Sequence, residues 1–79
     1  MALERVTFVA GIEILACSER DRFDLLRHIG EWSLFQGGNR IGRGFTRSNF
    51  ATELEAVEAA EKLGEEKLRS ILLGPGTDH

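Results

Sequence analysis

The sequence predicts an α+β fold, an antiparallel sheet of about four strands packed against one long C-terminal helix. Three observations predict this fold class. Residues 6–16 alternate between apolar and polar side chains, which is the period of a strand. Glycines interrupt residues 30–44 in the way that tight turns interrupt short strands. Residues 51–73 carry an apolar pattern of helical period behind a capping sequence.

The composition indicates one small globular domain, which we place at residues 1–74, followed by a flexible tail at residues 75–79. The chain has 79 residues, of which 42% are hydrophobic and 29% charged. No apolar run approaches the roughly 20 residues that cross a bilayer, and no secretory signal is visible at the N-terminus. The single cysteine, Cys17, excludes an internal disulfide. We therefore expect a cytoplasmic protein with no membrane contact.

The first element is a strand over Val6–Ala16. Gly11 interrupts the alternation and indicates a bulge, a bend or the turn of a short hairpin. Six apolar side chains are expected on one side of this strand: Val6, Phe8, Ala10, Ile12, Ile14 and Ala16.

The next segment, Ser18–Gly30, has the local features of a helix. Ser18 is a suitable cap and Gly30 a suitable stop, with acids in the first turn and Arg27-His28 in the last. A strand is the alternative, and a family resemblance given below favours it.

Two strands joined by a hairpin follow. Trp32 and Leu34 point to one side, and Gly37-Gly38 supplies the positive backbone dihedrals of a tight turn. The second of these strands is expected over Arg40–Arg47 and is broken by Ser48-Asn49.

A long helix over residues 51–73 is the last element. Thr52 and Glu55 have the spacing of a capping box. Glu58–Lys62 and Glu65–Arg69 are expected as ion pairs on the exposed side. Gly74-Pro75-Gly76 ends the helix. The apolar stripe expected to face the sheet consists of Leu54, Val57, Ala60, Gly64, Leu68 and Ile71.

The C-terminal half of the chain resembles the WGR domain, a module known from poly(ADP-ribose) polymerases and from short bacterial proteins. Gly38-Asn39-Arg40 stands where that family has Trp-Gly-Arg. The residues that carry the resemblance are Trp32-Ser33-Leu34, Arg40-Ile41-Gly42, Phe50, Thr52-Glu53, Glu55-Ala56, Ala59, Leu63 and Lys67.

The resemblance has implications for the fold and for the ligand. It implies a strand over Arg22–His28, paired with Glu31–Gln36 through a turn at Gly30-Glu31. It also implies that Arg40 occupies a position that contacts DNA ends, with Gly42 as its structural companion.

No catalytic constellation is visible, and we expect neither an enzyme nor a cofactor. The glycines of residues 37–44 fit no phosphate-binding loop, because Gly-x-x-x-x-Gly-Lys-Ser/Thr is absent. His28 and His79 have no second ligand at metal spacing, so no metal site is expected. Cys17 lacks a base partner and is read as a packing residue.

The charge distribution indicates a binding protein. The formal net charge is −3, but residues 19–47 carry six arginines against four acids, and residues 51–79 carry seven acids against three bases. We expect the chain to bind a nucleic-acid-processing protein complex with a basic surface, as an adaptor or inhibitor. Phage inhibitors such as anti-CRISPR proteins share its small size and acidity, a likeness of type without a common motif. The residues expected to bind this partner are Glu55, Glu58, Glu65 and Glu66.

The alternative is weak, sequence-independent contact with DNA or RNA through an arginine-bearing sheet face. Trp32 is expected in the core, or else as a stacking platform for a base. The oligomeric state is left open by the sequence. The residues of this alternative site are Arg27, Arg40, Arg43, Arg47 and Trp32.

Overall fold

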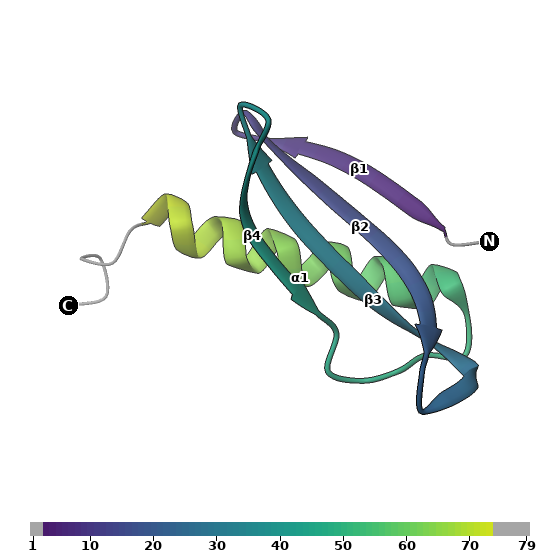
Figure 1. The fold of residues 1–79 in the computed structure, drawn as a ribbon. Helices are drawn as coiled ribbons and strands as arrows, with labels where there is room; N and C mark the ends of the chain where they lie inside the picture. The colour runs from purple at the N-terminus through teal and green to yellow at the C-terminus, as the bar shows by residue number, and fades with distance from the viewer. Residues whose placement is uncertain (1–2, 74–79) are drawn as a thin grey trace.

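The computed structural model describes residues 3–73, so the expected tail at 75–79 lies outside the described residues. Its four strands form one antiparallel sheet in the order β1-β2-β3-β4, and the helix α1 crosses one face of that sheet (Figure 1). This arrangement confirms the predicted α+β fold class. The elements in chain order are β1 (Glu4–Val9), β2 (Ile12–Asp21), β3 (Asp24–Gln36), β4 (Asn39–Phe45) and α1 (Glu53–Leu73).

Residues 6–16 form a hairpin, which confirms the hairpin turn that was one alternative for Gly11. The expectation that six apolar side chains share one side is wrong. Ala10 and Gly11 both have positive φ angles, 53° and 79°, as a two-residue hairpin turn requires. Val6 pairs with Leu15 across the hairpin. Because directly paired residues point to the same face, Val6 and Phe8 lie on the opposite face from Ile12, Ile14 and Ala16.

The segment Ser18–Gly30 is extended apart from its turn, which rules out the helix, but the expected pairing is wrong. The turn lies at Arg22-Phe23, where Asp21 pairs with Asp24. Gly30 and Glu31 lie inside the 13-residue strand β3 and pair with β2. There is therefore no turn at Gly30-Glu31, and these two residues of β3 pair with the preceding strand, β2.

The β3–β4 hairpin forms as expected around Gly37 and Gly38, with φ angles of 58° and 84°. The register shifts between Leu34 and Phe35, which marks an irregularity in the pairing with β4. Strand β4 ends at Phe45, two residues before the expected end at Arg47.

The capping box at the start of α1 is present. The Glu55 amide donates to Thr52 Oγ1 and the Thr52 amide donates to Glu55 Oε1, both at 3.2 Å. The expected apolar stripe is correct in its middle and wrong at its ends, since Leu54 is 47% exposed and Ile71 39% exposed. Both lie in terminal turns of the helix. The buried residues of α1 are Ala56, Val57, Ala60, Gly64 and Leu68.

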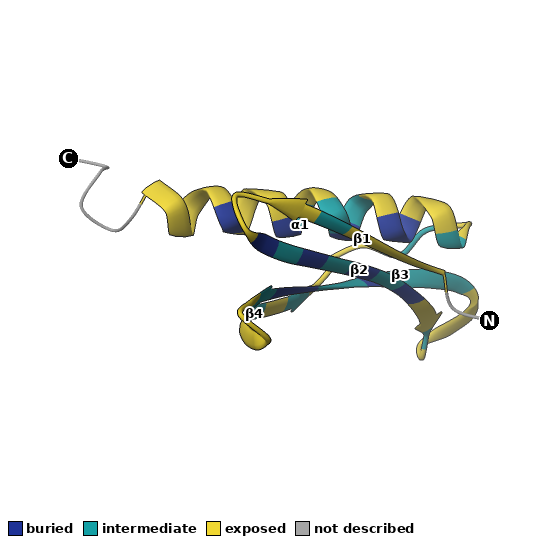
Figure 2. Ribbon diagram, turned by 90° about the horizontal axis from the view of Figure 1, so that it is seen from above, coloured by how far each residue is buried: buried dark blue, intermediate teal, exposed yellow. Residues whose placement is uncertain are grey.

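The core lies between α1 and the two central strands. Gly30 permits close approach of the helix, because an added Cβ there would overlap the Ala56 carbonyl oxygen and lie 2.8 Å from Ala60 Cβ. Figure 2 shows buried positions along the side of α1 that faces the sheet. Half-buried Trp32 packs against both core clusters, which are Ile12, Ile14, Leu34 and Leu68, and Ala16, Val57 and Ala60.

Candidate binding surfaces

The acidic residues expected to bind a protein lie on the exposed side of α1. Glu55, Glu58, Glu65 and Glu66 are all exposed. At 100° per residue they fall within about one third of the helix circumference, opposite the buried residues. Glu55 also serves in the capping box, so its carboxylate is already partly engaged.

The carboxylates of this helical surface are largely free of partners within the described residues. The expected pairs Glu58–Lys62 and Glu65–Arg69 are not among the salt bridges found there, so this expectation is wrong. The helix acid that does form a salt bridge is Glu61, which lies on the side facing β1. It accepts hydrogen bonds from Arg5 Nη1 at 3.1 Å and from Thr7 Oγ1 at 2.6 Å. Glu61 therefore links α1 to the edge strand β1 through these two hydrogen bonds.

The sheet has a second, uncovered face, which we call the outer face because it is turned away from α1. Cross-strand register assigns its residues, since paired residues share a face. Their side chains form three rows across the sheet: Glu4, Cys17, Glu31 and Phe45; Val6, Leu15, Ser33 and Arg43; and Phe8, Glu13, Phe35 and Arg40.

Arg40 and Arg43 are brought together on the outer face. The Arg40 guanidinium lies 5.5 Å from the centre of the Phe35 ring, and that of Arg43 lies 5.3 Å from the centre of the Phe45 ring. Arg43 Nε also donates a hydrogen bond to the carboxylate of Glu31. Arg43 is therefore already neutralised by a neighbour on the same face.

The other members of the alternative site lie elsewhere. Arg27 Nε donates to Asn49 Oδ1 at 2.6 Å, which fixes it beside the β2–β3 hairpin. Arg47 lies after β4, beside the helix. Trp32 lies on the helix-covered face, where its ring crosses Gly44 so closely that an added Cβ would be 2.6 Å away. The expected surface of four arginines with a stacking tryptophan is therefore not assembled.

The outer face is acidic around its centre. Burial raises the pKa of the Cys17 thiol, and the carboxylates of Glu31, Glu4 and Glu19 raise it further, whereas Arg43 acts in the opposite direction. The same carboxylates that disfavour a thiolate also disfavour a phosphate in this position. Cys17 is a protonated thiol at neutral pH and has no features of a nucleophile.

The tip of the β2–β3 hairpin exposes large apolar side chains. Phe23 is 93% exposed, Leu26 86% and Leu25 62%. Two hydrogen bonds to the Asp21 carboxylate stabilise the turn. Oδ1 accepts one from the Phe23 amide, and Oδ2 accepts the other from Asn49 Nδ2. Sequence reasoning missed this tip, although three large apolar residues within four positions between charged ones were a visible signal.

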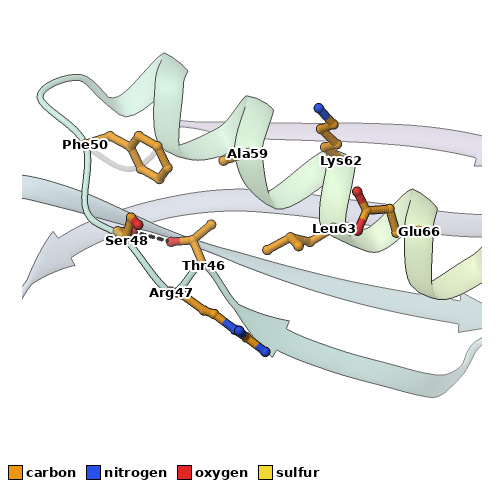
Figure 3. A pocket seen from close by; sticks show the side chains of 8 residues that line it. All are labelled: Thr46, Arg47, Ser48, Phe50, Ala59, Lys62, Leu63 and Glu66. Carbon is orange, nitrogen blue, oxygen red and sulfur yellow. Dashed lines mark hydrogen bonds between the residues drawn. The ribbon is translucent and has the colours of Figure 1, made fainter.

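A groove of about 250 Å³ lies between α1 and the segment that follows β4. Thr46 Oγ1 donates to the Ser48 carbonyl at 2.9 Å and shapes one wall (Figure 3). Leu63 reaches from the helix toward this wall, and Phe50 lies farther along the groove, nearer Ala59 (Figure 3). Arg47, Lys62 and Glu66 add charges of both signs, so the groove brings together residues from both expected sites.

Residues 3–73 contain no group of three or more His, Cys, Asp or Glu side chains that could hold a metal ion. In the same part of the chain, no helix is long and apolar enough to cross a membrane. Comparison with protein-family models, curated proteins and solved structures found no match to this chain.

Proposed function

We propose that this chain is a non-catalytic module that binds a basic surface of a nucleic-acid-processing protein complex in the cytoplasm, as an adaptor or inhibitor. The observation that carries the proposal is the exposed side of α1. There Glu58, Glu65 and Glu66 are held on a capped, well-packed helix and form no salt bridge within residues 3–73.

Physical reasons favour a basic protein partner. Exposed carboxylates on a rigid element attract a positively charged surface and accelerate its association. A protein surface that normally holds nucleic acid has that charge. The net charge of −3 acts in the same direction. The likeness of type to anti-CRISPR proteins points to the same class of partner.

A second candidate function is weak nucleic-acid binding on the outer face. The observation that favours it is the pairing of Arg40 with the Phe35 ring and of Arg43 with the Phe45 ring, since arginines and aromatic rings both stack on bases. The surrounding carboxylates oppose it, and Glu31 already occupies Arg43. We therefore rank it below protein binding.

Affinity capture with charge-reversed baits tests the first proposal. The wild-type chain, a Glu58→Lys/Glu65→Lys/Glu66→Lys variant and an Arg40→Glu/Arg43→Glu variant are used in parallel, after circular dichroism has shown that all three fold. We expect basic nucleic-acid-processing proteins to be captured by the wild type and the arginine variant and lost with the glutamate variant. Equal capture by all three baits would overturn the proposal.

Gel shifts with a blunt-ended DNA duplex and a single-stranded oligonucleotide test the second candidate. Micromolar binding at about 0.15 M salt, where surface charges are screened beyond about 8 Å, would promote this function above protein binding if Arg40→Glu abolished it. Absence of binding at that salt concentration would rule out nucleic-acid binding as a function of the outer face.

A further inference from the structure

The outer face leaves large apolar side chains uncovered on its two edge strands. On β1, Phe8 is 69% exposed and Val6 50% exposed, and on β4, Phe45 is 47% exposed. Between them lie the partly buried side chains of Leu15 and Phe35. Glu13, Glu31 and Arg43 lie among these apolar side chains in the rows of the outer face. Exposed apolar side chains that are grouped on one face mark interaction sites.

The charges of the outer face are divided between its two sides. The acids on strands β1 and β2 are Glu4, Glu13 and Glu19, whereas strand β4 carries Arg40 and Arg43. Strand β3 adds Glu31, which forms a salt bridge with Arg43. Rotation by 180° about an axis parallel to the strands turns the sheet over and reverses the strand order. It places β1 and β2 of one copy opposite β4 and β3 of another. The acidic half therefore meets the half that carries Arg40, which forms no salt bridge within residues 3–73.

We propose that two copies of this chain pack outer face to outer face about a two-fold axis parallel to the strands. The dimer is a two-layer β-sandwich with the α1 helices on its outside. Stacked sheets lie about 10 Å apart, so large side chains such as Phe8 and Phe45 reach the facing sheet. Because the axis keeps each row at the same height, Phe8 of one copy lies opposite Arg40 of the other. A two-fold contact of this kind uses the same surface on both copies.

The size of the face fits a dimer interface. Four strands spaced about 4.8 Å apart, with a mean length near nine residues of about 3.3 Å each, cover roughly 600 Å² in projection. Side-chain relief increases the accessible area toward the roughly 800 Å² per partner of a standard interface. The dimer does not depend on the function proposed above, and it leaves the acidic side of both α1 helices accessible.

Sedimentation velocity over a range of concentrations tests the dimer and the apolar part of its interface. We expect the wild type to sediment as a dimer at submillimolar concentration. Phe8→Ala and Phe45→Ala should each weaken it about tenfold or more, because the two-fold axis repeats each loss. Leu54→Ala is the matched control, since Leu54 on α1 is as exposed as Phe45, at 47%. A wild-type monomer at submillimolar concentration, or a dimer unaffected by both phenylalanine changes, would overturn the proposal.

Charge exchange between copies tests the orientation of the dimer. A Glu13→Arg chain carries only arginines at positions 13 and 40, and an Arg40→Glu chain carries only glutamates there, so each alone should dimerise at least about tenfold more weakly. Mixed in equal amounts, the two variants should recover a heterodimer, because positions 13 and 40, which are neighbours across the interface in the same row, again carry opposite charges. Failure of the mixture to associate more strongly than either variant alone would contradict the proposed axis.

The single cysteine reports whether the outer face is the surface that becomes covered. Cys17 lies on that face in the central strand β2. Because the dimer covers it, alkylation of its thiol should slow as the protein concentration rises through the dimer transition. A dimer that left the alkylation rate unchanged would have to form through another surface, and would refute the face-to-face arrangement.

Discussion

The two faces of the sheet are built from the same strands and differ in almost every physical property. Leu34 points to the helix-covered face and is fully buried, whereas its neighbour Phe35 points to the outer face and stacks with Arg40. The covered face uses glycine and alanine to bring α1 close, as at Gly30. The outer face combines phenylalanine with charge pairs. One face is therefore already a protein core, and the other has the composition of an interface.

Leu34 and Phe35 test this difference most directly. We expect Leu34→Ala to lower the free energy of unfolding by about 2–5 kcal/mol, because it leaves a cavity in a fully packed site. Phe35→Ala should lower it by about 1.5 kcal/mol or less, since that ring borders solvent. Urea denaturation below the concentration of self-association compares the two variants. Equal losses would mean that the outer face belongs to the fold of the monomer.

Gly30→Ala tests how closely the helix must approach the covered face. The added methyl group would overlap the Ala56 carbonyl oxygen, so we expect a loss of about 1–3 kcal/mol or more from overpacking. Gly42→Ala is the matched control on the same face, where the added Cβ would lie 3.4 Å from Leu34 and Trp32 atoms. Thermal melts followed by circular dichroism compare them, and a Gly30→Ala melt like that of the control would show that the helix can lift from the sheet.

Thr52→Ala tests whether the stability of the covered face depends on the start of α1. Removing the capping oxygen should cost about 0.5–2 kcal/mol, which in a domain of this size lowers the melting temperature by several degrees. Thr52→Ser keeps the oxygen and should restore most of the loss. If the alanine and serine variants melted alike, the hydrogen bond from the Glu55 amide would contribute nothing.

The smallest expected effect is a change in the pKa of Asp21, which lies at the turn between β2 and β3. A hydrogen bond from the Asn49 side chain, and a second from the Phe23 amide, lower the pKa of Asp21 below its ordinary value of 3.8. Because the folded pKa is the lower one, this stabilisation is present at neutral pH and is lost as the pH falls through that lowered value. Asn49→Ala should shift the Asp21 titration upward in an NMR experiment, and an unchanged titration would show that Asn49 does not bind this carboxylate.

The candidate surfaces were predictable to different degrees. The exposed position of Glu58 and Glu65 followed from the helical period alone, because the buried side of a helix fixes the opposite side. The separation of Arg27 and Arg47 from Arg40 did not follow, since it depends on a bond to Asn49 and on where β4 ends. The position of Glu61 did not follow either, because its partners Arg5 and Thr7 are more than fifty residues away in the chain.

The elements that followed from the sequence alone are those made by near neighbours in the chain. The capping box and the Gly37-Gly38 turn depend on residues within a few positions of one another, and these residues form them in the structure. Which face of each strand became core depended on the packing of the whole fold. Val6 and Ile14 have similar side chains, but the turn at Ala10-Gly11 puts them on opposite faces, and the helix covers only one. Burial depends on that distant helix, and a period of two residues specifies two faces without specifying which of them is covered.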